Sequence, residues 1–311
     1  MPARRVSKRG RGLALLLLWL CCAPALFAAT LDCPPAPPTA PLTTAPDASP
    51  YDHGLLWELR GPNGAVSHLY GTIHLSTPEI TAVTPQARAL LAASRTFGME
   101  VLLEPAALQA VAASVIASPG KSLGDRAPPA LRERVLALLA PYGVDATSAL
   151  RLKPWAAWTT LALPPDEHGT PLDLVLMHAA EAAGVPAFGI ETLAEQTALF
   201  DDLSPADELA LLTDAACHYE QQSAERQALI AAWLRTDLGA LYRLSLDDDS
   251  PLQKRLMARV LHARNQRMAE RLLPQLAKGG VFVAVGALHL PGADGLLARL
   301  KAAGFSLRAL D

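Results

Sequence analysis

Two segments of this sequence share one ending, and together they constrain the fold more than any other feature. LYGTIHLS (residues 69–76) and VAVGALHLPG (residues 283–292) are both apolar runs that lead into Gly-x-x-His-Leu. Short apolar runs that end at glycine predict buried strands. Helical patterns fill much of the chain between them, and strands separated by helices predict a largely parallel sheet with helical cover. The predicted fold class is therefore α/β.

The first of these strands is predicted to leave a hairpin. Residues 54–71 show two strand-like runs around Pro62-Asn63-Gly64, and Asn-Gly accepts the positive φ that a tight turn needs. We therefore expect an antiparallel hairpin ahead of the parallel sheet. Residues from about 105 to 165 are rich in Ala and Leu, with a helical period broken by prolines. They predict an inserted, mostly helical region.

The N-terminus has the layout of a secretory signal peptide. A basic start is followed by the apolar LALLLLWLCCAPALFAA, which ends in small residues at position 29. The alternatives are an uncleaved membrane anchor or a lipoprotein, but the apolar stretch is short for a bilayer span and contains a proline. Residues 30–50 are rich in Pro, Ala and Thr and predict a linker. We expect residues 51–311 to form a periplasmic or secreted α/β domain without a stable membrane anchor.

Two cysteines remain after the predicted cleavage, Cys33 and Cys217. An oxidising compartment favours a disulfide between them, which would tie the N-terminal segment to the body of the fold. Two free thiols are the alternative.

Composition excludes some partners. The chain carries 27 basic and 30 acidic side chains, spread along the sequence, and a net charge of -3. This balance gives no electrostatic footprint for nucleic acid or for an anionic membrane. With 51% hydrophobic residues the chain can bury a large core. The expected partner is a peptide or a small-molecule substrate.

Four residues that bind metals or transfer protons fall at or just beyond predicted strand ends: His74, Glu100, Glu191 and His289. In open α/β sheets ligands bind at this edge, so we expect one shared pocket. Imidazole and carboxylate together suit Zn²⁺, Mn²⁺, Fe²⁺ or Co²⁺, and such a metal makes hydrolysis the natural reaction. A metal-free site with a histidine base is one alternative, and hydrogen-bonded structural histidines are another.

Three arginines, Arg264, Arg267 and Arg271, lie on one face of a predicted helix just before the second strand. For Arg271 we expect a solvated face that pairs with acidic neighbours. For Arg264 an anion-binding or carbonyl-polarising role follows if that face lies against the sheet edge. The sequence contains no Gly-x-Ser-x-Gly elbow, Walker loop or Rossmann glycine pattern, which argues against common serine hydrolases and nucleotide binding.

The motifs together resemble those of the TraB/PrgY/GumN family, which includes the Tiki proteins and bacterial YbaP-like members. The resemblance rests on five segments: GLLWEL…LYGTIHLS, GMEVLLE, LD…A…GVPAFGIETLAEQ, RNQRM and VFVAVGALHLPGADGLLARLKAAGF. It implies an α/β fold similar to that of erythromycin-esterase-like and ChaN-like proteins. It also implies a pocket lined by His74, Glu100, His289 and Arg264, with Arg267 as the alternative arginine. Glu191 matches a family position to which we assign a structural or supporting role.

The resemblance implies more than one activity. The Tiki branch is described as metal-dependent proteases, whereas other branches are linked to pheromone shutdown, esterolysis or haem handling. We predict an exported metal-dependent peptidase or amidase in which His74, Glu100 and His289 bind the metal. Arg264 would stabilise the carbonyl oxyanion or a substrate carboxylate. The alternatives are a non-catalytic haem- or metal-binding protein of the same fold and a metal-free, esterase-like hydrolase with His74 as general base.

Overall fold

The computed structural model describes residues 31–35, 51–102, 105–165, 169–245 and 250–311. The predicted signal peptide and most of the predicted linker lie outside these residues. No helix within the described ranges is both long enough and apolar enough to span a bilayer.

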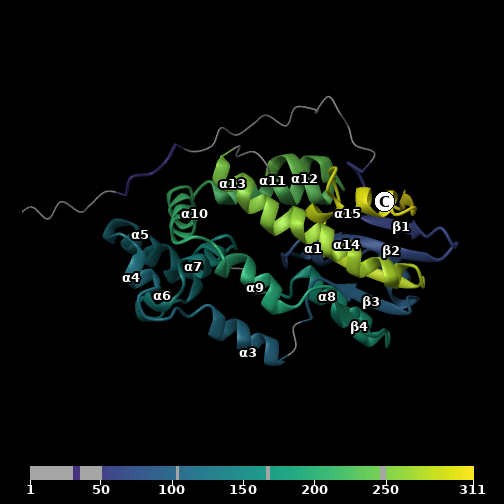
Figure 1. Cartoon of the computed structure of the whole chain (residues 1–311), viewed down its shortest axis with the longest axis horizontal. Helices are drawn as coiled ribbons and strands as arrows, with labels where there is room; N and C mark the ends of the chain where they lie inside the picture. Colours follow the sequence, from purple (N-terminus) through teal and green to yellow (C-terminus); the bar gives the residue numbers. More distant parts are fainter. Residues whose placement is uncertain (1–30, 36–50, 103–104, 166–168, 246–249) are drawn as a thin grey trace, which may run out of the picture.

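Six strands form one sheet in the order β4-β3-β5-β2-β1-β6. Figure 1 labels β1, β2, β3 and β4 of this sheet. Strands β2, β5, β3 and β4 run parallel to one another, whereas β1 is antiparallel to both β2 and β6. This arrangement confirms the predicted α/β fold class. The bounds are β1 Leu56–Arg60, β2 Val66–Thr72, β3 Thr96–Met99, β4 Ala187–Gly189, β5 Val281–Gly286 and β6 Ser306–Ala309.

The predicted hairpin is also confirmed. Strands β1 and β2 pair up to Arg60 opposite Val66, and the Gly61 amide donates to the Ala65 carbonyl across the turn. Gly64 has a φ of 81°, the left-handed conformation that glycine adopts without a steric cost.

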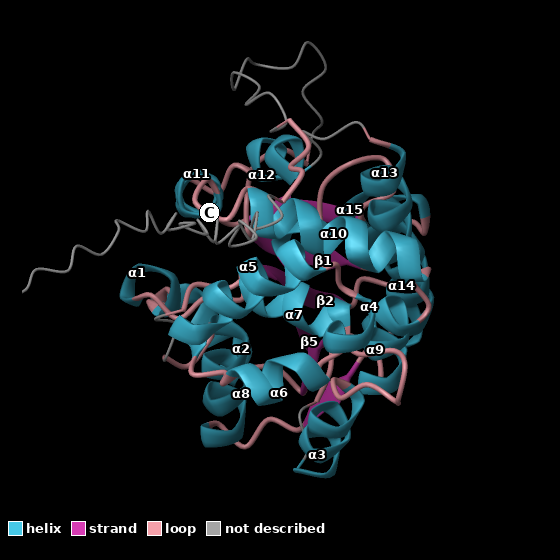
Figure 2. Ribbon diagram, turned by 90° about the vertical axis from the view of Figure 1, so that its left-hand side faces the viewer, coloured by secondary structure: helices cyan, strands magenta, loops and turns pink. Residues whose placement is uncertain are grey.

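Helices cover both faces of the sheet, which explains why its central strand is apolar throughout. Residues 281–285 of β5 are at most 1% exposed. Figure 2 shows α1 (Pro78–Thr81), α2 (Pro85–Ala92) and α8 (Leu172–Ala182) on one side and α14 (Ala263–Leu276) on the other. Gly184, with a φ of 70°, comes directly after the C-cap of α8, where glycine commonly ends a helix.

The other helices near the sheet are α9 (Leu193–Asp201), α11 (Gln222–Leu234), α12 (Leu238–Ser245), α13 (Pro251–Met257) and α15 (Leu296–Ala302). A π-helical turn, Ala258–His262, joins α13 to α14 without a break, and a 3-10 turn, Ala287–His289, follows β5.

A second hydrophobic core lies within a group of helices at the far end of the molecule from β3 and β4 (Figure 1). We call this group the helical subdomain. It contains α4 (Leu123–Arg126), α5 (Pro129–Leu139), α6 (Ala146–Arg151), α7 (Pro154–Leu161) and α10 (Pro205–Cys217). Helix α3 (Pro105–Ser114) lies between the two parts along the chain. Helix α10 comes from well beyond the insertion that the sequence predicts at about 105–165.

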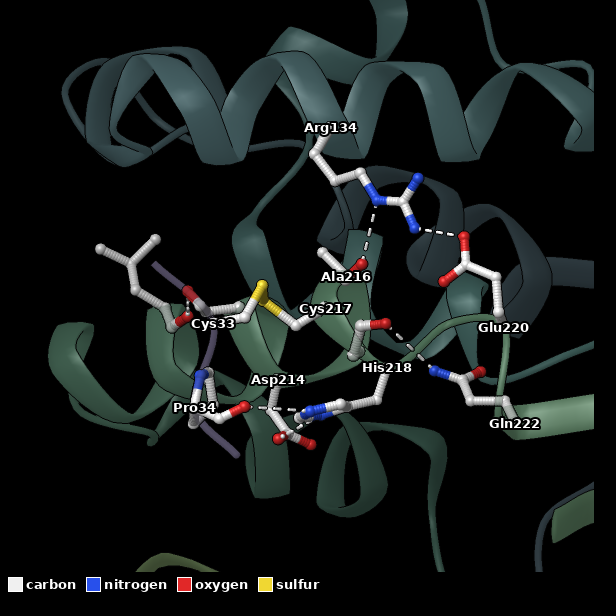
Figure 3. The surroundings of a disulfide bond; sticks show 12 residues. Cys33, Pro34, Arg134, Asp214, Ala216, Cys217, His218, Glu220 and Gln222 are labelled. Atoms are coloured by element: carbon white, nitrogen blue, oxygen red, sulfur yellow. Dashed lines mark hydrogen bonds and ion pairs between the residues drawn. A yellow bond between two sulfur atoms is a disulfide. The ribbon is translucent and has the colours of Figure 1, made fainter. Parts of the chain in front are cut away.

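A disulfide joins Cys33 to Cys217 at the end of α10, with 5.6 Å between the Cα atoms (Figure 3). Beside it, the Pro34 carbonyl lies 3.2 Å from Nε2 of His218. The predicted disulfide is therefore confirmed over the alternative of two free thiols, and it attaches residues 31–35 to the helical subdomain.

Candidate functional site

The residues predicted at strand ends lie at one edge of the sheet. His74 follows β2, Glu100 follows β3, Glu191 follows β4, and His289 ends the 3-10 turn after β5. These four strands are neighbours and run parallel, so their carboxyl ends meet at the same edge. The sheet therefore brings together side chains that are far apart in the sequence.

The glycines of the two Gly-x-x-His motifs have different surroundings. A Cβ added to Gly71 would stand 3.2 Å from Ala287 and from Leu290, so this glycine lets β2 pack closely against the turn after β5. A Cβ on Gly286 would instead stand 3.3 Å from Oε1 of Glu100 and 4.0 Å from Nε2 of His74. Gly286 therefore keeps open a small space toward which the predicted site residues converge.

Glu100 is a buried and ionised carboxylate. Its Oε1 accepts the Gly286 amide at 2.8 Å, and its Oε2 accepts Arg264 and, at 3.1 Å, Gln196. Burial alone would raise the pKa of Glu100, but His289, which is charged at the low pH where Glu100 titrates, the charges of Arg264 and His74, and the Gly286 amide outweigh burial and hold this pKa well below its usual range. Glu100 thus keeps its negative charge at any physiological pH.

Arg264 and Glu191 form a buried support beneath Glu100. All three nitrogens of Arg264 donate to protein acceptors: Nε to Glu191, NH1 to the Val260 carbonyl, and NH2 to both Glu100 and Glu191. The Glu191 side chain is fully buried, and its Oε1 accepts Arg267 at 2.9 Å. The anions that Arg264 binds in this structure are therefore the protein's own carboxylates, because the arginine face lies against the sheet edge beside two glutamates.

Arg271 lies one turn further along α14 and behaves as the sequence predicts. It pairs with Glu195 at 2.6 Å and donates to the Ile190 carbonyl, and its side chain is 40% exposed. The prediction of a solvated face that pairs with acidic neighbours is confirmed for Arg271.

His74 stands at the open side of the site, with 62% of its side chain exposed. Its Nδ1 donates to Oδ2 of Asp173 at 2.7 Å, and the other oxygen of Asp173 accepts the Thr72 hydroxyl at 2.6 Å. The hydrogen bond to Asp173 raises the pKa of His74 to about 9. In the metal-free protein His74 is therefore protonated at neutral pH.

His289 stands at the closed side, and its side chain is only 6% exposed. Nδ1 donates to Oδ1 of Asn265 at 2.6 Å, since the Asn265 amide nitrogen is used by the Asp294 carbonyl. Burial lowers the pKa of His289 to about 4, so the ring is neutral at physiological pH. Its Nε2 carries the lone pair and lies 3.7 Å from Oε1 of Glu100.

Sequence reasoning missed the residues that hold the two imidazoles. Asp173 lies in the first turn of α8, and Asn265 lies in α14 next to Arg264. Both stand inside motifs that the family resemblance uses, LD at 172–173 and RNQRM at 264–268. A polar residue inside a family motif is a signal in the sequence that could have indicated a supporting role, but only the fold shows which histidine each one contacts.

The donor chemistry of the site fits a divalent metal, although its present geometry is not that of a completed metal site. Each Nδ1 is held by an oxygen acceptor, as is usual for histidines that bind a metal through Nε2. Among the described residues, no three His, Cys, Asp or Glu side chains are grouped closely enough to hold an ion as they stand. The atoms nearest the space beside Gly286 are Oε1 of Glu100, Cδ2 of His289 and Nε2 of His74.

Comparison with known proteins places this chain in one family. A model described as the TraB/PrgY/gumN family matches residues 55–309, which include all six strands of the sheet. No match was found among curated proteins or among solved structures. The match contains both Gly-x-x-His motifs and the carboxylates between them. The chain therefore belongs to the TraB/PrgY/gumN family.

Proposed function

We propose that this protein is an exported, metal-dependent hydrolase that cleaves peptide or amide bonds. The observation that carries the proposal is the pair of imidazoles, each held at Nδ1. Nε2 of His289 lies 3.7 Å from Oε1 of Glu100, and Nε2 of His74 borders the same space beside Gly286. The disulfide between Cys33 and Cys217 supports export, since disulfides persist in oxidising compartments.

His74 and His289 would hold the metal through Nε2, and Glu100 through Oε1. Mn²⁺, Co²⁺, Zn²⁺ and Fe²⁺ all suit this donor set. When bound, such a cation supplies an acidic water and polarises a carbonyl, which is the chemistry of hydrolysis.

The protein's own residues prepare this site. Arg264, Gln196 and the Gly286 amide fix Glu100 in its ionised form, while Asp173 and Asn265 set the ring orientations of the two histidines. Because His74 is exposed and His289 is buried, substrate would reach the site from the His74 side. In our proposal Arg264 positions Glu100 and does not contact the substrate oxyanion.

The raised pKa of His74 weighs against the metal-free alternative. A general base must be unprotonated at the working pH, and an imidazole with a pKa of about 9 holds its proton at neutral pH. A non-catalytic haem- or metal-binding protein remains the competing function, and turnover separates it from the hydrolase.

The test starts from purified full-length protein, expressed with its own N-terminus and loaded with Mn²⁺, Co²⁺ or Zn²⁺. Bound metal is measured by mass spectrometry, and cleavage is followed with fluorogenic peptide and ester libraries, with and without EDTA. We expect about one metal per chain and peptide cleavage that EDTA abolishes.

Variants locate the site. His74→Ala and His289→Ala should lose the metal and the cleavage, whereas His178→Ala, which changes an exposed histidine on α8, should keep both. Full metal content in both site variants would overturn the metal site. Metal binding without any cleavage would favour the non-catalytic function.

A further inference from the structure

A groove with a volume of about 890 Å³ opens between the loop after β2 and the helical subdomain. Its apolar lining comes from five places: the loop after β2, the start of α1, the end of α5, the segment after α7, and α11. The residues are Leu75, Pro78, Leu138, Pro164, Pro165 and Ile230. This volume lies in the range of sites that bind small molecules or short peptides, about 300–1,000 Å³.

The groove begins next to the candidate site along the chain. Leu75 follows His74 directly, and the Leu172 amide fixes this part of the loop by donating to the Leu75 carbonyl at 3.1 Å. His74 is also the more exposed of the two imidazoles. A ligand that contacts Leu75 in the groove therefore lies against the residue that follows the solvent-facing imidazole.

Helix α11 gives the groove a polar side as well as an apolar one. Ser223, Arg226, Gln227 and Ile230 stand at i, i+3, i+4 and i+7, so they share one face of the helix. Hydroxyl and amide side chains can form hydrogen bonds with the backbone groups of a peptide. A hydrocarbon chain has no groups that could form such bonds. The mixed lining therefore suits a peptide better than a fatty acyl chain.

Among the lining residues that the structure describes, two are charged, Glu220 and Arg226. Arg134 pairs with Glu220 at 2.5 Å, as Figure 3 shows, so this carboxylate already has a cation. Arg226 donates to the Ala162 carbonyl at 3.3 Å, and no acidic side chain of the described ranges pairs with it. A ligand with a carboxylate near Arg226 would complement this charge.

We propose that the groove is the substrate-binding site and takes an extended, largely apolar peptide segment with an acidic residue that pairs with Arg226. This inference rests on the proposed peptidase function, and it names the substrate class of that same site. Ile230 and the prolines contact the apolar residues of the segment, and Ser223 and Gln227 bond its backbone.

The experiment measures binding apart from turnover. Two dansylated hexapeptides of Leu, Ala and Pro, both amidated at the C-terminus, differ only in a last residue of Glu or Lys. Their fluorescence anisotropy is titrated with EDTA-treated full-length protein, so that no cleavage interferes. We expect the Glu peptide to bind about five- to tenfold more tightly, because attraction to an exposed arginine replaces repulsion.

The charge and the shape of the groove are then changed in separate variants, and each has a control substitution at or near the end of the same helix. Arg226→Glu should reverse the preference, whereas Arg235→Glu, at the exposed end of α11, should not. Ile230→Trp should fill the groove and weaken both peptides about tenfold or more. Leu234→Trp, at a side chain that is 47% exposed, should leave binding unchanged. Circular dichroism confirms that each variant is folded.

The outcomes separate this inference from the proposed function. Unchanged binding in folded Arg226→Glu and Ile230→Trp variants would overturn the groove, even if the loaded enzyme cleaves peptides. Displacement of both peptides by dodecanoate at equal or lower concentration would also overturn it, since that identifies an acyl-chain site. Charge-dependent binding without any metal-dependent cleavage would support the groove and count against the hydrolase.

Discussion

At the scale of single residues, His74 and His289 differ in how their charge is set. Asp173 stabilises the protonated form of His74 and raises its pKa to about 9, whereas burial keeps His289 neutral. We predict that Asp173→Asn lowers the His74 pKa toward the unperturbed value of about 6.5. The measurement is an NMR titration of the imidazole signals in metal-free protein, with His74→Ala used to assign the signal.

The same shift predicts how stability depends on pH. A histidine whose pKa is raised on folding stabilises the folded state fully below its unfolded pKa of about 6.5. This contribution is lost as the pH rises through about 9. The free energy of unfolding should therefore fall more steeply between pH 7 and pH 10 in the wild type than in Asp173→Asn. Parallel profiles for the two proteins would contradict the assigned role of Asp173.

The two motif glycines provide a matched pair of substitutions. Gly286 has a φ of -51°, which alanine can adopt, and its Cβ would enter the space beside Glu100 and His74. We predict that Gly286→Ala folds but loses at least about tenfold in affinity for Co²⁺, because the ligands can no longer converge. Isothermal titration calorimetry measures this affinity.

Gly71→Ala should act on stability. Its Cβ would press on Ala287 and Leu290, and overpacking of this kind costs about 1–3 kcal/mol. Urea unfolding of both variants distinguishes the two effects. If both variants lost metal affinity equally and stability equally, the two glycines would not have these different roles.

At the scale of elements, the sequence predicts the sheet and its edge but not the contacts beneath that edge. Short apolar runs, glycines and the Asn63-Gly64 turn are local signals, and the strands and the hairpin follow from them. The contact of Asp173 with His74 and of Asn265 with His289 depends on how α8 and α14 pack on opposite faces of the sheet. Local pattern carries no information about such packing.

The π-helical turn Ala258–His262 is another feature that the sequence pattern does not show, since the whole segment has a helical period. A π turn holds an extra residue, and such turns occur often at functional sites. Here it directly precedes Arg264 and Asn265. It therefore sets the rotation of α14 that directs both side chains toward the strand ends.

Deletion of Ala258 tests this role. Removing one residue would turn α14 by about 100° relative to α13, so the contacts of α13 and those of Arg264 could not both be kept. We expect lower stability, by more than about 1 kcal/mol, and loss of metal binding. Ala258→Ser, which keeps the length of the turn, is the control and should bind metal normally. Normal binding in the deletion variant would rule out a positioning role.

At the scale of the whole molecule, the protein has two hydrophobic cores, and the site and the groove lie on different parts of it. The candidate site stands on the sheet, while the groove uses the sheet-side loop after β2 and residues of α5 and α11. Helix α10 joins the second core from a distant part of the sequence, which no local pattern could indicate. In our proposal, changes in the helical subdomain would alter substrate binding in the groove without altering His74, Glu100 and His289.

The disulfide tests this separation, because it attaches residues 31–35 to the helical subdomain and contacts none of the site residues. Cys33 and Cys217 are 184 residues apart, and loss of a disulfide that closes so long a loop typically costs about 2–4 kcal/mol. We predict that the double variant Cys33→Ser/Cys217→Ser unfolds at lower urea concentration by about that free energy. The double variant is used so that no lone thiol remains.

Metal content of the double variant is the second measurement. The proposed metal ligands belong to the strand ends. In the absence of urea, the folded variant should therefore bind Co²⁺ with the same affinity as the wild type. Wild-type protein treated with a reducing agent is the control and should behave like the variant. Loss of metal from the folded variant would show that the helical subdomain and the strand ends form a single cooperative unit, since a change confined to α10 would then reach His74, Glu100 and His289.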